Sequence, residues 1–166
     1  MDILSSFSLA GRTALVTGGA YGLGFAMARA LAGAGARVAF NCRSQENLNK
    51  ALVDYAACGV DARGYLCDVT DETQVARLVE TIENDLGPID ILVNNAGVIR
   101  RVPMTEMSTE EFRQVVDIDL VGPFICAKAV IPGMADRGHG KIINICSMMS
   151  ELGRETVSAY AAAKGG

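Results

Sequence analysis

The sequence predicts an α/β fold in which a doubly wound parallel sheet is covered by helices on both faces. Short apolar runs alternate with helical segments along the chain, which is the pattern of repeated βαβ units. The apolar runs are continuous rather than alternating, as expected of strands that are buried on both sides. A glycine cluster at 18–24 separates the first apolar run from the first helical segment and predicts a tight turn there.

Five apolar runs are the expected strands. They cover residues 12–17, 37–41, 62–67, 89–93 and 141–146. Each has the length of a buried strand and is followed by turn residues or by a helical pattern. Because right-handed crossovers connect successive strands in such folds, we expect all five strands to lie parallel in one sheet.

The segments between these runs have the composition and the spacing of helices. The expected helices cover residues 25–34, 45–57, 73–86, 109 to about 134, and 156–164. Strong helix formers fill the first, and apolar residues recur at helical spacing in the second and third. Thr70 is expected to cap the third helix, and Pro132 with Gly133 to end the fourth, which is long enough to contain a break.

A single domain is expected over residues 1–166, because no linker, repeat or low-complexity tract interrupts the pattern. This length is sufficient to bury a core. The last helix has no capping signal, and no sixth strand follows it. We therefore expect the sheet to be incomplete at the C-terminus and the chain to be part of a longer protein.

The composition excludes several classes of protein. Half of the residues are hydrophobic and 20% are charged, which is incompatible with a disordered chain. A net charge of -4, an aromatic content of 5% and the absence of Trp argue against a nucleic-acid partner. The apolar stretch 14–40 is interrupted by glycines and by Arg29 and Arg37, so no membrane span is expected.

The cysteines and the histidine indicate a reducing compartment and no metal site. Five cysteines at irregular spacing, with no C-x-x-C pair, are typical of free thiols in a cytoplasmic protein. Cys146 is expected to be buried and unreactive. The one histidine, His139, is expected to be a turn residue, and a single histidine disfavours a zinc site.

The glycine cluster has the spacing G-x-x-x-G-x-G in 17–24. Gly18 permits a tight turn, Gly22 lets the backbone approach a phosphate, and Gly24 allows close packing of the helix. The N-terminus of the following helix offers free N–H groups and a positive dipole to a pyrophosphate. A plain βα turn is the alternative, but the position in the first βαβ unit favours a dinucleotide site.

The end of the second strand bears on the choice of cofactor. NAD-binding folds place an acidic residue there for the ribose 2′-hydroxyl, but the first acid here is Glu46. Arg43 is instead placed to pair with a 2′-phosphate, so we expect NADP(H) to be preferred over NAD(H). A solvated surface arginine is the alternative interpretation of Arg43.

Tyr160 and Lys164 lie four residues apart, which puts them on one face of a helix. A free tyrosine has a pKa of about 10, but a nearby ammonium favours the phenolate and makes a phenol useful near neutral pH. Such a tyrosine can exchange a proton with an alcohol or a carbonyl as a hydride is transferred. Ser147, after the fifth strand, is placed to hydrogen-bond the reacting oxygen.

The chain resembles the short-chain dehydrogenase/reductase family over essentially its whole length. The resemblance lies in the order and spacing of Thr17-Gly18-x-x-x-Gly22-x-Gly24, Asn94-Asn95-Ala96-Gly97, Ser147 and Tyr160-x-x-x-Lys164. It implies a Rossmann-type sheet and a homo-tetramer. It also implies that Tyr160 is the acid–base group, that Lys164 contacts the nicotinamide ribose, and that Ser147 orients the substrate.

The resemblance further implies the cofactor contacts, with one departure from the family pattern. The contacts are expected at Thr17, Gly18, Tyr21, Gly22, Leu23, Gly24, Arg43, Asp68, Val69, Asn95, Ala96, Gly97, Tyr160 and Lys164. The family has an asparagine in the central helix that supports a water relay to the lysine, whereas this chain has Asp119. An ionised aspartate accepts hydrogen bonds but cannot donate them, which leaves the catalytic part of Asp119 open.

Two stretches, 94–107 and 143–164, resemble the gluconate 5-dehydrogenase subgroup of this family. The resemblance implies a sugar acid or polyol as the small-molecule substrate, with D-gluconate and 5-keto-D-gluconate as the first choice. Arg100, Arg101 and Arg154 lie in loops after strands, and a guanidinium suits a carboxylate. Arg101 is the preferred substrate contact, with solvated loop charges as the alternative. A 3-oxoacyl thioester reductase and a non-catalytic nucleotide-binding fragment are the competing interpretations.

Overall fold

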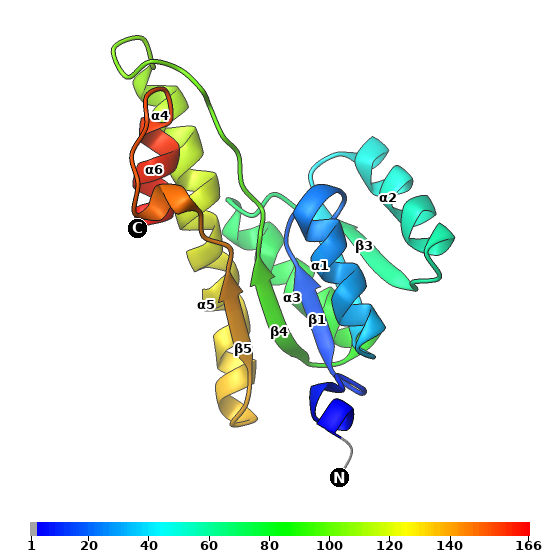
Figure 1. Cartoon of the computed structure of the whole chain (residues 1–166). Coiled ribbons are helices and arrows are strands. Elements are labelled where there is room, and N and C mark those ends of the chain that lie inside the picture. The colour runs from blue at the N-terminus through cyan, green and yellow to red at the C-terminus, as the bar shows by residue number, and fades with distance from the viewer. Residues whose placement is uncertain (1–2) are drawn as a thin grey trace.

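The computed structural model describes residues 3–166 and shows one sheet of five parallel strands in the order β3-β2-β1-β4-β5 (Figure 1). The strands are β1 (Thr13–Val16), β2 (Arg37–Cys42), β3 (Ala62–Leu66), β4 (Ile89–Asn94) and β5 (Lys141–Asn144). The chain runs outward from β1 to β3 and then returns to the other side of β1. The predicted doubly wound parallel sheet is confirmed.

Helices cover both faces of this sheet. They are α1 (Gly22–Gly33), α2 (Gln45–Ala57), α3 (Glu72–Leu86), α4 (Thr109–Val116), α5 (Gly122–Asp136) and α6 (Ser158–Gly165). α1 and α2 pack on one face and α3 and α5 on the other, whereas α4 and α6 pack together beyond the carboxyl ends of β4 and β5 (Figure 1). None of the helices within residues 3–166 is long and apolar enough to cross a bilayer.

The core consists of two apolar layers, one on each face of the sheet. In the first layer, Phe40 on β2 and Tyr55 on α2 are fully buried, with ring centres 4.9 Å apart. In the second, Ile82 on α3 packs with Leu15 and Leu92 from the strands. Burying one such side chain contributes roughly 1.5–3 kcal/mol, so these layers hold rigid the strands that carry the functional loops.

Two helices differ from the prediction at their first turn. α1 begins at Gly22 rather than at residue 25, so the glycine cluster itself supplies its first turn. Asp71, not Thr70, caps α3, because its carboxylate accepts a hydrogen bond from the Gln74 N–H at 3.0 Å. Thr70 instead donates its hydroxyl to Asp68. A carboxylate at the cap also interacts favourably with the helix dipole, which a threonine does not.

The predicted central helix is two helices, α4 and α5, joined by a π-helical turn at Asp117–Val121, where the expected break lies. α5 continues through Pro132 to Asp136, so the prediction that Pro132 and Gly133 end it is wrong. Pro132 lies on the exposed side of α5, while Met134 beyond it is buried. Packing of Met134 therefore holds the last turn despite the missing backbone N–H of the proline.

The last strand and the last helix are shorter than predicted. β5 ends at Asn144 rather than at residue 146, and α6 begins at Ser158 rather than at Thr156. Thr156 has a φ of +67°, which excludes it from the helix. All residues of β5 are exposed, and only Ala62 of β3 is buried, so the expected burial on both faces holds for β1, β4 and most of β2 but not for the two edge strands.

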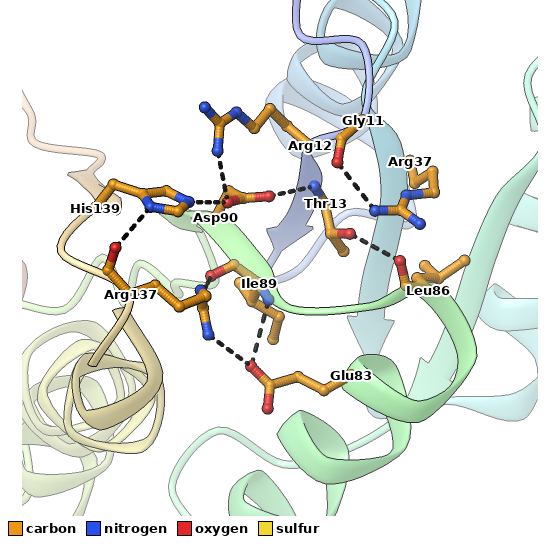
Figure 2. Close-up of polar contacts among 10 residues, drawn as sticks. All are labelled: Gly11, Arg12, Thr13, Arg37, Glu83, Leu86, Ile89, Asp90, Arg137 and His139. Atoms are coloured by element: carbon orange, nitrogen blue, oxygen red, sulfur yellow. Dashed lines mark hydrogen bonds and ion pairs between the residues drawn. The ribbon is translucent and has the colours of Figure 1, made fainter. Parts of the chain in front are cut away.

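Polar side chains connect the amino ends of β1 and β4 (Figure 2). The buried Asp90 carboxylate accepts hydrogen bonds from the Thr13 N–H at 3.0 Å and from Arg12 at 3.1 Å. His139 Nε2 lies 2.9 Å from this carboxylate, and His139 Nδ1 lies 3.1 Å from the Arg137 carbonyl oxygen. His139 is therefore more than the predicted turn residue, because its ring joins the α5–β5 turn to β4.

This network determines how the stability contribution of Asp90 depends on pH. Burial alone would raise the pKa of Asp90, but hydrogen bonds from Thr13, His139 and Arg12 outweigh burial and hold the pKa below its usual value. A carboxylate with a lowered pKa stabilises the fold above its unfolded-state pKa, and the stabilisation is lost as the pH falls through its folded-state pKa.

We expect Asp90→Asn to destabilise the protein by about 2 kcal/mol at neutral pH, because buried donors lose an ionised acceptor. Acidification should then remove less stability from Asp90→Asn than from the wild type. Urea unfolding at neutral and acidic pH measures both effects, with the exposed Asp61→Asn as the matched control. Equal acid sensitivity of Asp90→Asn and the wild type would contradict this prediction.

Candidate functional site

A cavity of about 390 Å³ lies at the carboxyl ends of the central strands. All predicted cofactor residues line it except Thr17, Tyr160 and Lys164. Asn41, Ser44, Asn47 and Ile118 also line it, and the sequence analysis missed them because their side chains belong to no motif. The volume is within the range of pockets that bind small molecules and cofactors.

The glycine turn tolerates no side chain at two of its positions. Gly18 has a φ of +63°, and a Cβ there would lie 2.9 Å from the Ala96 Cα. A Cβ on Gly24 would lie 2.5 Å from both the Asn95 Nδ2 and the Gly18 carbonyl oxygen. The glycine turn therefore packs against the loop after β4 at Gly18 and against the Asn95 side chain at Gly24, and it presents its own backbone to the cavity.

α1 begins at the cavity without a side-chain cap. Its N-cap residue, Tyr21, has an extended backbone and makes no capping hydrogen bond. The first N–H groups of α1 are available to an anion, and the helix dipole favours negative charge there. The Tyr55 hydroxyl donates to the Gly19 carbonyl at 2.7 Å and supports the turn from α2. The helical spacing of Tyr55 predicts a core residue and does not indicate this contact.

Thr17 and Asn95 join the loops that follow β1 and β4. The buried Thr17 hydroxyl accepts hydrogen bonds from the N–H groups of Asn95 and Ala96, each at 3.0 Å. The Asn95 side-chain amide donates to the Thr17 and Gly18 carbonyls at 2.8 and 3.2 Å. Thr17 therefore lies behind the cavity wall, and Asn95 fixes the glycine turn as well as lining the cavity.

The corner of the cavity where a 2′-phosphate is predicted lies between β2 and α2. Arg43 lines this corner with a side chain that is 54% exposed, and its Nη1 lies 3.8 Å from the Asp68 Oδ2. Ser44 caps α2 by accepting a hydrogen bond from the Asn47 N–H at 3.3 Å. The guanidinium and the N-terminal end of α2 make this corner attractive to an anion, although Asp68 offsets part of the charge.

Tyr160 and Lys164 share one face of α6, as their spacing predicts. Lys164 Nζ lies 5.8 Å from the centre of the Tyr160 ring. This nearly buried ammonium donates to the Ile145 carbonyl at 3.0 Å and lies 3.5 Å from the Asp119 Oδ2, a distance too long for a strong hydrogen bond. The network holds a positive charge beside the phenol and ties α6 to the loop after β5.

Asp119 is almost completely buried in the π-helical turn. Its Oδ1 accepts a hydrogen bond from the Val98 N–H at 2.7 Å, whereas its Oδ2 has no hydrogen-bond partner within the described chain. Burial raises the pKa of Asp119 by more than the Val98 N–H and the Lys164 ammonium lower it. Because Val98 lines the cavity, Asp119 connects the lysine to the cavity wall.

Ser147 follows β5 and begins the 3-10 helix Met148–Ser150. Its Oγ accepts a hydrogen bond from the Met149 N–H at 3.1 Å, which leaves the hydroxyl proton available for donation. Cys146 is exposed, so the prediction of a buried thiol is wrong. The physical reason is that Cys146 follows the edge strand β5, whose own residues are exposed as well.

The three arginines considered for substrate recognition are exposed in the loops after β4 and β5. Arg100 donates to the Gln114 Oε1 at 3.2 Å. Arg101 and Arg154 make no hydrogen bond or ion pair within residues 3–166. The preference for Arg101 over Arg100 as a ligand contact gains support from this difference, because the guanidinium of Arg100 is already engaged.

The residues around the cavity fit a dinucleotide. A Cβ at Gly18 or Gly24 would clash with the residues around the glycine turn. The N-terminus of α1 has no side-chain cap, and the Arg43 guanidinium adds positive charge at one corner of the cavity. Backbone N–H groups at a helix N-terminus are the usual partners of a pyrophosphate. The Tyr160–Lys164 pair is linked through Asp119 to the same cavity, so the phenol and the cavity belong to one connected structure.

Comparisons with known proteins agree with this arrangement. The family profile described as short chain dehydrogenase matches residues 12–166. The chain is 53% identical over 161 residues to the 2-dehydro-3-deoxy-D-gluconate 5-dehydrogenase of Formosa agariphila. That alignment covers 96% of this chain and 61% of the relative.

Two solved structures have the same fold and similar sequences. The 2-keto-3-deoxy-D-gluconate dehydrogenase from Streptococcus agalactiae is 61% identical with a TM-score of 0.81, over 96% of this chain and 60% of that one. A gluconate 5-dehydrogenase from Burkholderia cenocepacia, in complex with NADP and tartrate, is 42% identical with a TM-score of 0.90, over 98% of this chain and 64% of that one. The chain spans less than two thirds of the length of each of these three proteins.

Gly24→Ala should destabilise the protein by about 2 kcal/mol and weaken NADPH binding, because the added Cβ meets Asn95 and Gly18 at 2.5 Å. Gly33→Ala is the matched control, since α1 has open space there and alanine is the better helix former. Urea unfolding and fluorescence titration with NADPH measure the two effects. Similar behaviour of the two variants would show that the close contact at Gly24 is unimportant.

Proposed function

This chain belongs to the short chain dehydrogenase family, and on that premise we propose that the protein is an NADP(H)-dependent oxidoreductase that interconverts a secondary alcohol and a ketone. One observation carries the proposal. The nearly buried Lys164 ammonium lies 5.8 Å from the Tyr160 ring and is joined through Asp119 to the wall of the glycine-rich cavity. A non-catalytic nucleotide-binding protein has no need of a charge held beside a phenol in this way.

Tyr160 is the group that exchanges a proton with the reacting oxygen. A bound nicotinamide cofactor supplies or accepts the hydride. In the direction of reduction, Tyr160 donates its proton to the carbonyl oxygen, and the Lys164 ammonium stabilises the phenolate that remains. The Ser147 hydroxyl, whose proton is not used inside the protein, donates to the same oxygen and orients it.

Asp119 holds Lys164 in place and offers a path for a proton. In its ionised form it attracts the Lys164 ammonium at 3.5 Å. Its raised pKa makes the neutral form more accessible than for an exposed aspartate. A protonated carboxyl donates a hydrogen bond as an asparagine amide does, whereas the ionised carboxylate only accepts one.

NADP(H) is the proposed cofactor. The backbone around Gly18, Gly22 and the N-terminus of α1 would hold the pyrophosphate, and Asp68 would lie near the adenine. Arg43 and the N-terminal end of α2 would hold the 2′-phosphate. Support comes from the lack of an acidic residue at the end of β2 and from the lining of that corner by Arg43. The NADP complex of the Burkholderia protein points in the same direction.

A six-carbon sugar acid is the proposed substrate, with D-gluconate and 5-keto-D-gluconate as the first choice. 2-Dehydro-3-deoxy-D-gluconate is the second candidate, favoured by the 53% identical relative that is named for it. D-Gluconate and 2-dehydro-3-deoxy-D-gluconate both have a carboxylate at C1 and a hydroxyl at C5. Either acid therefore needs a site that binds the carboxylate and places C5 at the reacting groups. Arg101, whose guanidinium is free, suits the carboxylate.

We also propose a homo-tetramer in the cytoplasm. Large apolar side chains are exposed along the central helices, with Phe124 at 65% and Ile131 at 49% on α5. Leu120 and Val121 in the π-helical turn add to this surface. An apolar surface of this kind favours contact with another copy of the chain. Free cysteines fit a reducing compartment.

Tyr160→Phe should lower the rate of NADPH oxidation with 5-keto-D-gluconate by about a thousandfold, because the proton donor is lost. NADPH binding should stay near the wild-type value, since the ring fills the same space. Tyr65→Phe is the matched control, because the Tyr65 hydroxyl bonds only the exposed Asp85. Absorbance assays on the complete gene product measure the rate. A wild type that reduces no sugar acid would refute the proposed substrate class.

Arg43→Asp should weaken NADPH binding at least about tenfold and change NADH binding little, because only NADPH has a 2′-phosphate that loses its partner and meets a carboxylate. Arg63→Asp, with the same charge change at an exposed position of the edge strand β3 that does not line the cavity, should leave both affinities unchanged. Fluorescence titration with each cofactor measures the affinities. A parallel loss for both cofactors would contradict the assignment of Arg43.

A further inference from the structure

One backbone hydrogen bond joins the loops that follow β4 and β5. The Val102 N–H donates to the Thr156 carbonyl at 2.9 Å, and we call this pair the loop clamp. Val102 lies between β4 and α4, and Thr156 lies between β5 and α6. Near the clamp, the Ser158 hydroxyl lies 3.8 Å from the Met107 sulfur. The two loops are therefore held together at the start of the helix that carries Tyr160.

Thr156 adopts a backbone conformation that its side chain disfavours. With a φ of +67°, it is the one non-glycine residue within 3–166 that has a positive φ. A β-branched residue rarely adopts this region, and such strain persists where surrounding contacts enforce it. The loop clamp and the burial of Val157, which is 1% exposed, are those contacts here. The fold thus keeps the two loops together against the local preference of Thr156.

Each of the two clamped loops carries an arginine without a partner. Arg101 directly precedes Val102, and Arg154 lies two residues before Thr156. Neither guanidinium makes a hydrogen bond or an ion pair within the described part of the chain. The Arg101 Cα lies within about 4 Å of the Val102 Cα, and the Arg154 Cα lies within about 7 Å of the Thr156 Cα. Both arginine side chains are long enough to reach one ligand group bound next to the loop clamp.

We propose that Arg154 and Arg101 together bind the substrate carboxylate, and that Val102 and Thr156 are positioning residues that set the spacing of the two guanidiniums. The inference rests on the proposed function and adds Arg154 and the loop clamp to it. Each guanidinium presents a fork of N–H donors, so two of them satisfy both oxygens of one carboxylate.

The loop clamp connects carboxylate recognition to the reacting end of the substrate. Thr156 lies four residues before Tyr160, and its loop begins shortly after Ser147. A carboxylate held by Arg101 and Arg154 therefore lies at a set distance from the phenol and the serine hydroxyl. The site should select acids whose carboxylate and reacting carbon are separated by this distance, and should discriminate against neutral ketoses.

Arg154→Gln and Arg101→Gln in the complete, NADP(H)-loaded protein test the pair, with Arg63→Gln on β3 as the charge-matched control. Calorimetric titration with D-gluconate gives the Kd, and reduction of 5-keto-D-gluconate gives kcat and KM. L-Sorbose, which has a CH₂OH group in place of the carboxylate of 5-keto-D-gluconate, is the neutral comparison. Each arginine variant should raise Kd and KM for the acids about tenfold or more, with kcat and the L-sorbose reaction little changed.

The outcomes separate this inference from the proposed function. If Arg101→Gln raises KM and Arg154→Gln does not, the proposed function stands and the arginine pair is wrong. An equal rise in KM for L-sorbose would also contradict carboxylate binding by Arg101 and Arg154, because the effect would not depend on the carboxylate. If the wild type binds NADPH but neither binds nor reduces any sugar acid, the proposed function fails, and the pair fails with it.

Val102→Pro tests the loop clamp, because it removes the N–H donor. Pro103 already favours an extended backbone at residue 102, and proline is compatible with extended backbone of the polyproline type. This variant should raise KM for the acids as Arg154→Gln does and leave NADPH binding unchanged. Val102→Ala keeps the N–H, and Thr156→Gly keeps the carbonyl without strain, so each should raise KM for the acids much less than Val102→Pro does. Equal KM values for Val102→Pro and Val102→Ala would overturn the role of the clamp.

Discussion

The position of one nearly buried ammonium connects the separate parts of the candidate site. Lys164 Nζ meets the Ile145 carbonyl, the Asp119 carboxylate and the face of the Tyr160 ring, so the loop after β5, the π-helical turn and α6 converge on one charge. An ammonium shielded from water is costly unless it is paired, which makes these three elements depend on one another. Through the Val98 N–H, Asp119 extends the same network to the cavity wall. The charge therefore fixes where the phenol lies relative to the cavity.

The cavity itself follows from the order of the strands. Because the chain leaves β1 toward β3 and returns to the other side of β1 as β4, the loops after β1 and β4 emerge next to each other at a reversal of direction. Thr17 and Asn95 bond these two loops, and Gly18 and Gly24 let them touch without side chains between them. The parallel sheet supplies the crevice, Gly18, Gly24 and Asn95 line it, and Thr17 supports it from behind.

Much of this arrangement could be predicted from the sequence because its signals are local. Continuous apolar runs identify the strands, and the four-residue spacing of Tyr160 and Lys164 places them on one helix face. Contacts between distant segments have no local signal, so the support of the glycine turn by Tyr55 and the pairing of His139 with Asp90 could not be predicted. The errors at Pro132 and Cys146 arise in the same way. Core packing of Met134 prolongs α5, and the position of β5 at the edge of the sheet leaves the thiol exposed.

The two ends of the sheet differ in how their charged groups are used. At the amino ends, the Asp90 carboxylate accepts hydrogen bonds from Thr13 and Arg12 and lies 2.9 Å from His139 Nε2, and these contacts hold β1 to β4. At the carboxyl ends, Asp119 Oδ2 has no hydrogen-bond partner, and Arg101 and Arg154 have no partner among the described residues. A polar group without an internal partner gains most from a ligand, because binding supplies the hydrogen bond that folding left unmade. The same chain thus obtains stability from the amino ends and keeps its capacity to bind at the carboxyl ends, where the strained Thr156 also lies.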